Sequence, residues 1–152
     1  MEILIIVILL IALFSFWVVS TRRRLTVMHE NVESAINQIG VQLSSRYDML
    51  TRALNQAKDY DVCTACNLIA KVNFHRCVIT SVSTTGEVME QEKMIQSVLE
   101  ELEKMVRQHP EINENKDYSK FMEAVDSYGR MLQTSTLIYN DSVTKFNRAV
   151  CM

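Results

Sequence analysis

The chain begins with MEILIIVILLIALFSFWVVS, residues 1–20, and this stretch decides how the rest of the protein is arranged. Between residues 3 and 19 only Ser15 is not apolar, and no side chain is charged. A helix of about 18 residues is roughly 27 Å long, close to the roughly 30 Å of hydrocarbon in a bilayer. We therefore expect residues 3–20 to lie in a lipid bilayer and residues 1–21 to form a single transmembrane helix.

A cleaved signal peptide is the main alternative for this stretch. Such a peptide has a basic start, an apolar core of about 7 to 15 residues and a small-residue cleavage site. This chain instead has Glu2 at its start and runs through Trp17 into the basic residues 22–24. Because basic residues beside a span are retained in the cytoplasm, we expect the N-terminus outside and residues 22–152 in the cytosol. The predicted location is the inner (cytoplasmic) membrane, with a single pass.

The composition of the chain favours one helical domain after the span. Sixteen basic and eighteen acidic residues leave a net charge of −2, which provides no basic surface for nucleic acid. Three glycines and one proline are too few for the turns of an all-β fold. The four cysteines follow the span, on the side predicted to be cytosolic, where thiols stay reduced.

Apolar residues in the first part of this domain recur every three or four positions, which is typical of one stripe on a long helix. The stripe consists of Met28, Val32, Ile36, Ile39, Leu43, Tyr47, Leu50, Leu54 and Ala57. Gly40 interrupts it, and we expect a bend or a close helix approach there. Residues 59–79 continue the helix less clearly, with Val62, Cys66, Ile69 and Val72 or Asn73 on one face. The first hairpin turn is predicted in the Ser- and Thr-rich residues 80–86.

Two further helices are predicted in the second half of the chain. One covers residues 87–108 and ends at His109, because Pro110 denies its predecessor the helical conformation. Residues 111–117 form a turn, and a second helix covers residues 118–150. Its apolar seam consists of Phe121, Val125, Tyr128, Leu132, Ser135, Tyr139, Val143, Phe146 and Val150. Such heptad-like seams are buried only against other helices, so we predict an all-α fold: an N-terminal transmembrane helix followed by a long antiparallel helical bundle with coiled-coil-like seams.

Three blocks of the sequence are similar to one known family. Residues 31–50, NVESAINQIGVQLSSRYDML, resemble the signature helix of the LemA family, approximately NxVExAxxQIDVQLxRRYDLIPNL. Residues 109–118, HPEINENKDY, are similar to its YPDLKANENF turn, and residues 139–147, YNDSVTKFN, to its FYNDAVRDYN stretch. The resemblance implies a bacterial, membrane-anchored helical bundle whose biochemical function is poorly defined.

This chain departs from the family pattern at three places. Gly40 stands where the family favours Asp, and Thr51 stands where it usually has Pro. The sequence also ends at Cys151 and Met152, before the Phe-Pro-containing tail that is usual in the family. We therefore interpret residues 22–152 as a LemA-like bundle that is short at its C-terminus or comes from a longer chain.

One cluster of residues has the types that bind metals or react as thiols. Cys63 and Cys66 form a Cys-x-x-Cys pair, followed by His75 and Cys77. Three cysteines and one histidine are able to hold Zn²⁺ in a tetrahedron. On a helix, however, His75 and Cys77 point in different directions, and cysteine is often a small buried residue. We expect packed or exposed thiols here, and we assign no metal site.

No other group of residues suggests catalysis. Glu100, Glu101, Glu103, Glu111 and Glu114 are predicted on solvated faces or in a turn, and the phosphate-binding and nucleophile motifs are absent. We expect no cofactor and no enzymatic activity. The interpretation is a membrane-anchored scaffold or interaction protein that binds an unidentified protein or itself. The alternatives are a zinc or thiol-redox protein using the Cys63 cluster and a membrane signalling module.

Overall fold

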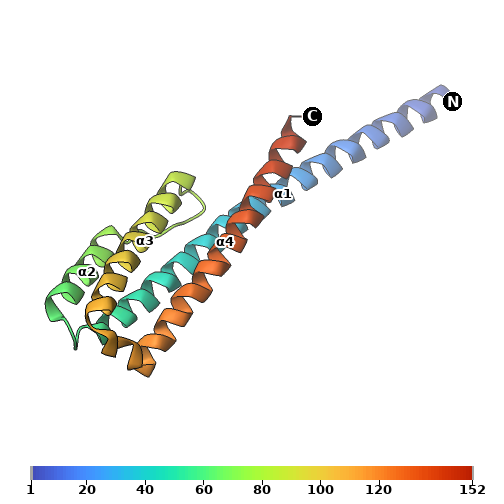
Figure 1. Ribbon diagram of the computed structural model, residues 1–152. Helices are drawn as coiled ribbons and strands as arrows, with labels where there is room; N and C mark the ends of the chain where they lie inside the picture. Colours follow the sequence, from blue (N-terminus) through green and yellow to red (C-terminus); the bar gives the residue numbers. More distant parts are fainter. Residues whose placement is uncertain (1, 152) are drawn as a thin grey trace.

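The computed structural model describes the backbone of residues 2–151 and the side chains of residues 5–151, and the described chain is helical with no strand. The elements in chain order are α1 (Glu2–Ala57), α2 (Val62–His75), α3 (Thr85–Gln108), the short 3₁₀ helix η1 (Pro110–Glu114) and α4 (Lys116–Val150). Helices α2 and α3 lie beside one part of α1, and α4 follows it over most of the body (Figure 1). The prediction of an all-α protein is confirmed.

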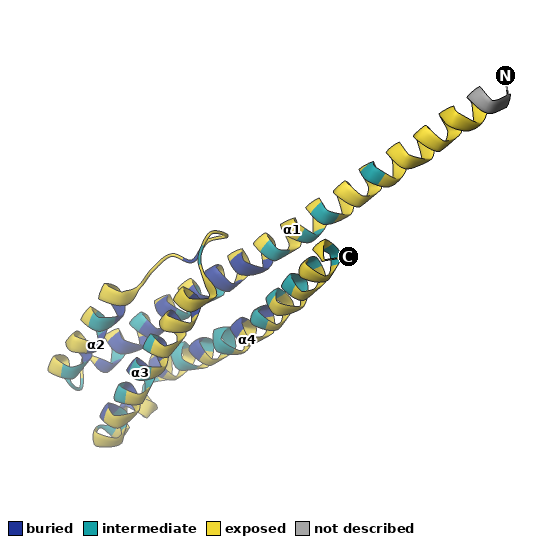
Figure 2. Cartoon of the chain, turned by 90° about the horizontal axis from the view of Figure 1, so that it is seen from above, coloured by how far each residue is buried: buried dark blue, intermediate teal, exposed yellow. Residues whose placement is uncertain are grey.

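Helix α1 runs without a break from the apolar N-terminal stretch into the body of the protein. Its 56 residues correspond to a length of about 84 Å at 1.5 Å per residue. No change of secondary structure occurs at residues 21–22, where the sequence suggests a boundary between span and domain. The N-terminal part of α1 extends beyond the other helices, and its residues 5–24 are exposed apart from the half-buried Val18 (Figure 2).

The predicted stripe of α1 forms the centre of the core from Ile36 onward. Leu43, Tyr47 and Leu50 are all at most 1% exposed. The other helices pack against this stripe through Ala65, Leu68, Val72, Val88, Ile95, Val98, Leu102, Met105, Tyr118, Val125 and Leu132. In the 87–108 helix, the apolar residues at helical spacing, Val88, Ile95, Val98, Leu102 and Met105, are all buried.

Helix α4 lies along α1 in a defined register. The rings of His29 and Phe146 are 5.8 Å apart, and Gly129 lies against the guanidinium group of Arg46. Residue numbers therefore rise along α1 as they fall along α4. The α4 seam is closely packed at Val125, half-buried at several later positions and exposed at its end, at Val150.

Helix α2 corrects two predictions. The chain turns at residues 58–61 before α2, so the first reversal comes about twenty residues earlier than predicted. The buried face of α2 is Ala65, Leu68 and Val72, whereas the predicted face included the exposed Val62 and Cys66. The Asp61 carboxylate accepts a hydrogen bond from the backbone N–H of Thr64 and begins a new helix. The buried face of α2 therefore does not continue the apolar stripe of α1.

The ends of the later helices have local causes. Thr84 and Glu87 form a capping box at the start of α3, because each side chain accepts a hydrogen bond from the backbone N–H of the other. Helix α3 ends at Gln108, as the following His109-Pro110 pair predicts. The predicted turn after it contains η1, whose Ile112 is fully buried.

The loop between α2 and α3 crosses α1 at Gly40. A Cβ atom added to Gly40 would overlap the backbone carbonyl oxygen of Ile79, which belongs to this loop. Ile79 is itself buried, with 7% of its surface exposed. The close approach predicted at Gly40 is therefore made by a loop backbone rather than by another helix.

Replacing Gly40 by Ala is expected to destabilise the protein by about 1–3 kcal/mol, because the added methyl group must displace the Ile79 backbone. An exposed glycine in a helix would instead gain up to about 1 kcal/mol from the same change. Gly86→Ala is the matched control, because its added Cβ meets only the Thr84 hydroxyl at 3.7 Å. Thermal unfolding followed by circular dichroism measures both variants. Equal stability changes in the two would contradict the close contact.

Candidate functional site

The most distinctive surface of the protein is the N-terminal part of α1. Its large apolar side chains, including Phe16 at 75% and Trp17 at 63%, are exposed to the surroundings of the chain. The other members of this surface are Ile5, Ile6, Val7, Ile8, Leu9, Leu10, Ile11, Leu13, Phe14 and Val19. We call this set the apolar segment.

The apolar segment has the physical properties of a membrane-crossing helix. It is long and apolar enough to cross a bilayer, and the rest of the protein buries none of its most apolar 18-residue stretch. Burying one large apolar side chain away from water stabilises a structure by about 1.5–3 kcal/mol. The many exposed side chains of this segment therefore favour an apolar environment strongly.

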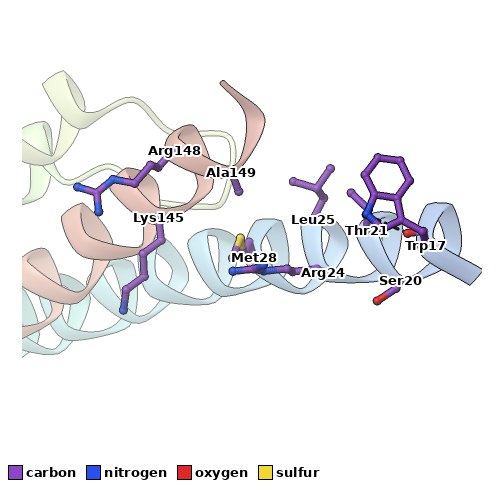
Figure 3. A pocket seen from close by; sticks show the side chains of 9 residues that line it. All are labelled: Trp17, Ser20, Thr21, Arg24, Leu25, Met28, Lys145, Arg148 and Ala149. Carbon is purple, nitrogen blue, oxygen red and sulfur yellow. Dashed lines mark hydrogen bonds between the residues drawn. The ribbon is translucent and has the colours of Figure 1, made fainter. Parts of the chain in front are cut away.

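A cleft lies at the base of the apolar segment, between α1 and the end of α4 (Figure 3). Its volume is about 650 Å³. Helix α1 contributes Trp17, Ser20, Thr21, Arg24, Leu25 and Met28, and α4 contributes Lys145, Arg148 and Ala149. In Figure 3, Ala149 points toward Met28 across the cleft, and Lys145 extends toward α1. We call this the basal cleft.

The charged side chains of the basal cleft are all basic: Arg24, Lys145 and Arg148. Lys145 forms an ion pair with Asp141 at 2.6 Å, one turn earlier on α4. Arg148 lies in the last turn of α4, where a cation complements the partial negative charge of the helix end. The cleft therefore combines an apolar wall with a basic rim.

The Cys63 cluster does not form a centre. Cys63 and Cys66 are exposed on α2, and His75 and Cys77 are exposed at its end and in the following loop. Within residues 5–151 no group of three or more His, Cys, Asp or Glu side chains is placed to hold a metal ion. The ring of His75 packs edge-on against Phe74. The geometry therefore offers no support for the zinc alternative.

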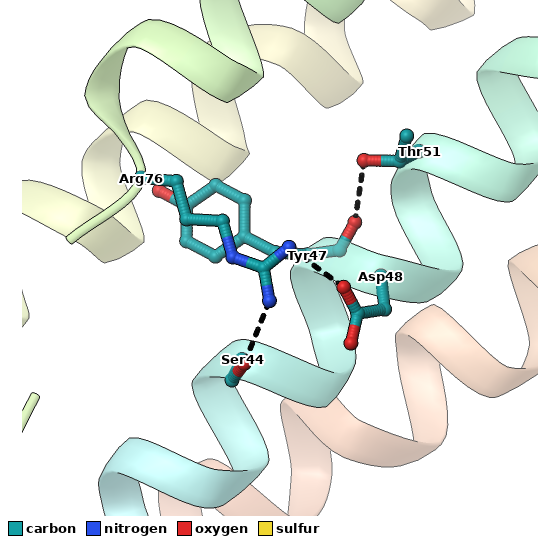
Figure 4. A network of polar contacts seen from close by, with 5 residues as sticks. All are labelled: Ser44, Tyr47, Asp48, Thr51 and Arg76. Carbon is teal, nitrogen blue, oxygen red and sulfur yellow. Dashed lines mark hydrogen bonds and ion pairs between the residues drawn. The ribbon is translucent and has the colours of Figure 1, made fainter. Parts of the chain in front are cut away.

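Polar contacts with α1 hold the end of α2 in place. Arg76 donates hydrogen bonds to the Asp48 carboxylate at 2.7 Å and to the Ser44 hydroxyl at 2.8 Å (Figure 4). The Tyr47 hydroxyl, which is buried nearby, donates to the backbone carbonyl of Gln91 at 3.2 Å. Gln91 is also buried, and its side-chain amide donates to the carbonyl of His75 at 2.7 Å. This network joins α1, α2 and α3 and has a structural role.

The remaining residues that the sequence singles out are dispersed. Glu100, Glu103, Glu111 and Glu114 are exposed, whereas Glu101 pairs with Lys71 at 2.7 Å. Tyr139 is half-buried against the core, as its place in the seam predicts. Among the methionines, Met105 is buried, Met94 and Met122 are half-buried, and Met89 and Met131 are exposed. Within the described chain, none of these glutamates belongs to a group of three or more His, Cys, Asp or Glu side chains that could hold a metal ion.

A model of the LemA family matches residues 35–152. The chain belongs to the LemA family. The match begins at Ala35, the first buried residue of α1, and covers the whole helical body that this family member shows. It confirms the resemblance seen in the sequence. No curated protein matches the chain, and no solved structure does.

The basal cleft is the feature that sequence reasoning missed in this LemA-family chain. The basic residues 22–24 are evident in the sequence, but Lys145 and Arg148 become their neighbours only through the register of α4 on α1. The periodic seam of residues 118–150 was the only sequence pattern that indicated how far α4 follows α1. Its continuation toward the chain end places residues near 146 beside His29.

Tyr47 predicts a pH dependence of stability. Burial, with a smaller effect from nearby Cys77, raises the pKa of its hydroxyl from 10.0 to about 12. The folded state therefore holds this proton more tightly than the unfolded state does. The contribution of the protonated Tyr47 hydroxyl to the free energy of unfolding is complete below pH 10 and is lost as the pH rises from 10 to 12. The loss is up to about 3 kcal/mol at roughly 1.4 kcal/mol per pKa unit.

The Tyr47→Phe variant provides the comparison. Near neutral pH it is expected to be less stable than the parent by about 1 kcal/mol, because the hydrogen bond to Gln91 is lost. Between pH 10 and 12 only the parent loses stability through ionisation of Tyr47, so the difference in free energy of unfolding between the two chains should shrink and then change sign. Denaturant unfolding of both chains across this range measures it. A difference independent of pH would show that Tyr47 titrates normally.

Proposed function

We propose that this LemA-family protein is a membrane-anchored helical scaffold without catalytic activity, which acts by binding another protein or further copies of itself. The observation that carries the proposal is the exposed apolar segment, joined to the bundle by one continuous helix. An anchor of this kind concentrates the bundle at a membrane surface. A helix without a linker also keeps the bundle at a defined distance from that surface.

The proposed location is the inner membrane, with a single pass formed by residues 3–20. The basic residues 22–24 directly follow the apolar segment, and such residues are retained on the cytoplasmic side. The N-terminus then lies outside, and the antiparallel bundle of residues 22–152 lies in the cytosol. The exposed state of all four cysteines suits a reducing compartment.

A binding role is favoured over a catalytic one by where the reactive side chains lie. The cysteines lie on α2, on the loop after it and at the chain end, whereas the five glutamates that the sequence singles out, Glu100, Glu101, Glu103, Glu111 and Glu114, lie on α3 and η1. Catalysis needs such groups to converge at one position. Their distribution over separate exposed surfaces suits a protein that presents its faces to partners.

A signalling module is the second candidate, because one structural observation favours it. Helix α1 is continuous from the apolar segment to Ala57 and contacts α2, α3 and α4. A displacement of the anchor would therefore reach all the packed helices. In this case partner binding would depend on the anchor, whereas a scaffold binds through its bundle alone.

The anchor is tested by two charges placed in the apolar segment. Leu9→Arg with Leu13→Arg is expected to release the full chain from membranes, because each Arg near a bilayer centre costs about 2.5–3.5 kcal/mol. Alkaline carbonate extraction of membranes measures the retained fraction. Val78→Arg with Val82→Arg is the matched control, since these side chains are exposed in the α2–α3 loop. Retention of the double Leu variant would refute the span.

The same variants separate the scaffold from the signalling module. Chemical cross-linking of the full chain in cells, followed by purification, is expected to yield the same partner bands for the parent and for the released Leu9→Arg, Leu13→Arg variant. The scaffold proposal requires these bands to persist after release. Their loss on release alone, with normal helix content, would favour the signalling module.

The proposed topology is tested by thiol labelling. A membrane-impermeant maleimide applied to intact cells is expected to leave Cys63 and Cys66 unmodified and to modify both after lysis, because both are exposed in the structure. A Glu2→Cys variant should be labelled in intact cells. Labelling of Cys63 from outside would reverse the assigned orientation.

A further inference from the structure

We propose that the basal cleft binds the headgroup of an anionic phospholipid. Arg24 on α1 and Lys145 and Arg148 on α4 would attract the phosphate to this cleft, with the acyl chains along the apolar segment. This inference rests on the proposed membrane anchoring and adds to it a specific lipid class and a specific site.

The shape of the basal cleft suits one lipid headgroup. Its volume of about 650 Å³ falls within the range of about 300–1,000 Å³ that is typical of small-molecule sites. Trp17, Leu25 and Met28 form an apolar wall, while Ser20 and Thr21 provide hydroxyl groups. A wall of this kind contacts a lipid glycerol and upper acyl chain better than it contacts a free hydrated ion.

The charge of the cleft is complementary to a phosphate. Arg24, Lys145 and Arg148 line it, and no carboxylate does. Lys145 is paired with Asp141, but within the described part of the chain neither arginine forms an ion pair. A guanidinium group matches the oxygens of a phosphate with two parallel hydrogen bonds. The ammonium group of a zwitterionic lipid would find no carboxylate partner among the lining residues.

The position of the cleft along α1 matches the surface of a bilayer. Trp17, Thr21, Arg24 and Met28 are spaced at three or four residues and lie on the face of α1 that turns toward α4. The apolar segment ends at Val19, so Arg24 lies about 7 Å further along the helix at 1.5 Å per residue. Headgroups occupy this level when residues 3–20 span the hydrocarbon. Because Phe146 lies beside His29, α4 brings Arg148 to within about one helical turn of this level and places Lys145 about one turn further toward the body of the protein.

The single tryptophan of the chain provides a direct readout, because Trp17 lines the cleft. The full chain is reconstituted in phosphatidylcholine vesicles that contain brominated phosphatidylglycerol or brominated phosphatidylcholine at equal mole fractions. Bromine atoms on a bound lipid quench tryptophan fluorescence at short range. We expect stronger quenching by the brominated phosphatidylglycerol, which gives a relative preference for the anionic lipid.

Removal of the α4 cations tests the cleft itself. Lys145→Gln with Arg148→Gln is expected to lower the preference by up to about fivefold for each cation. The control Arg22→Gln with Arg23→Gln removes two charges near the same level from residues that do not line the cleft, and should have a smaller effect. If both double variants lose the preference for the anionic lipid equally, or only the control loses it, the preference comes from general electrostatic attraction of anionic lipids to the protein surface, and the proposal is overturned.

A second variant tests the space without changing the charge. Ala149→Phe fills the cleft between α4 and Met28, so the lipid preference should fall although all three cations remain. An unchanged preference would show that the cleft is not the site. Circular dichroism of each variant identifies any loss of folding, and a folded variant that lacks the preference supports the cleft.

Two further measurements separate this proposal from its alternatives. Flotation with the vesicles tests the anchor: a chain that does not float refutes the anchoring and the lipid site with it, whereas a chain that floats without lipid preference refutes the site alone. Inorganic phosphate is compared with sodium chloride at equal ionic strength. Selective abolition of the preference by phosphate would identify a site for a free anion and overturn the lipid assignment.

Discussion

The structure depends on the continuity of one backbone helix. In α1 the same hydrogen-bond ladder supports the exposed apolar segment and the buried stripe around Leu43, Tyr47 and Leu50. Each of the other three α-helices packs against this element. The position of every packed helix relative to the apolar segment is therefore set by α1. A flexible connection after residue 20 would remove that relation.

The long helices were predictable because their apolar periodicity is extended. Leu43, Leu102 and Leu132 lie within runs spaced at three or four residues, and packing in the structure agrees with these runs. Helix α2 was not predictable in the same way. It is short, its buried face includes the small residue Ala65, and its start is set by the Asp61 cap. A helix face extrapolated from α1 through residues 58–61 was therefore wrong.

The candidate site was less accessible to sequence reasoning than the fold. The apolar segment is evident from composition, but the basal cleft joins Arg24 to residues more than a hundred positions later. Their proximity depends on the lengths of two helices and of the turn around η1, which periodicity alone does not define. The loop contact at Gly40 is a similar case, because a glycine within a helix pattern does not reveal what lies against it.

The α2–α3 loop crosses α1 far from the apolar segment, so the packed helices reach toward that segment to different extents. Gly40 lies twenty residues after Ser20, a rise of about 30 Å along the helix axis. Helix α4, in contrast, reaches back to the level of Arg24. With residues 3–20 in a bilayer, α2 and α3 begin far enough from the lipid to leave space for a small protein domain between them and the membrane surface. On the side of α4 almost no such space remains. A second protein at the membrane surface would therefore find α1 accessible on the side of α2 and α3 and covered on the side of α4.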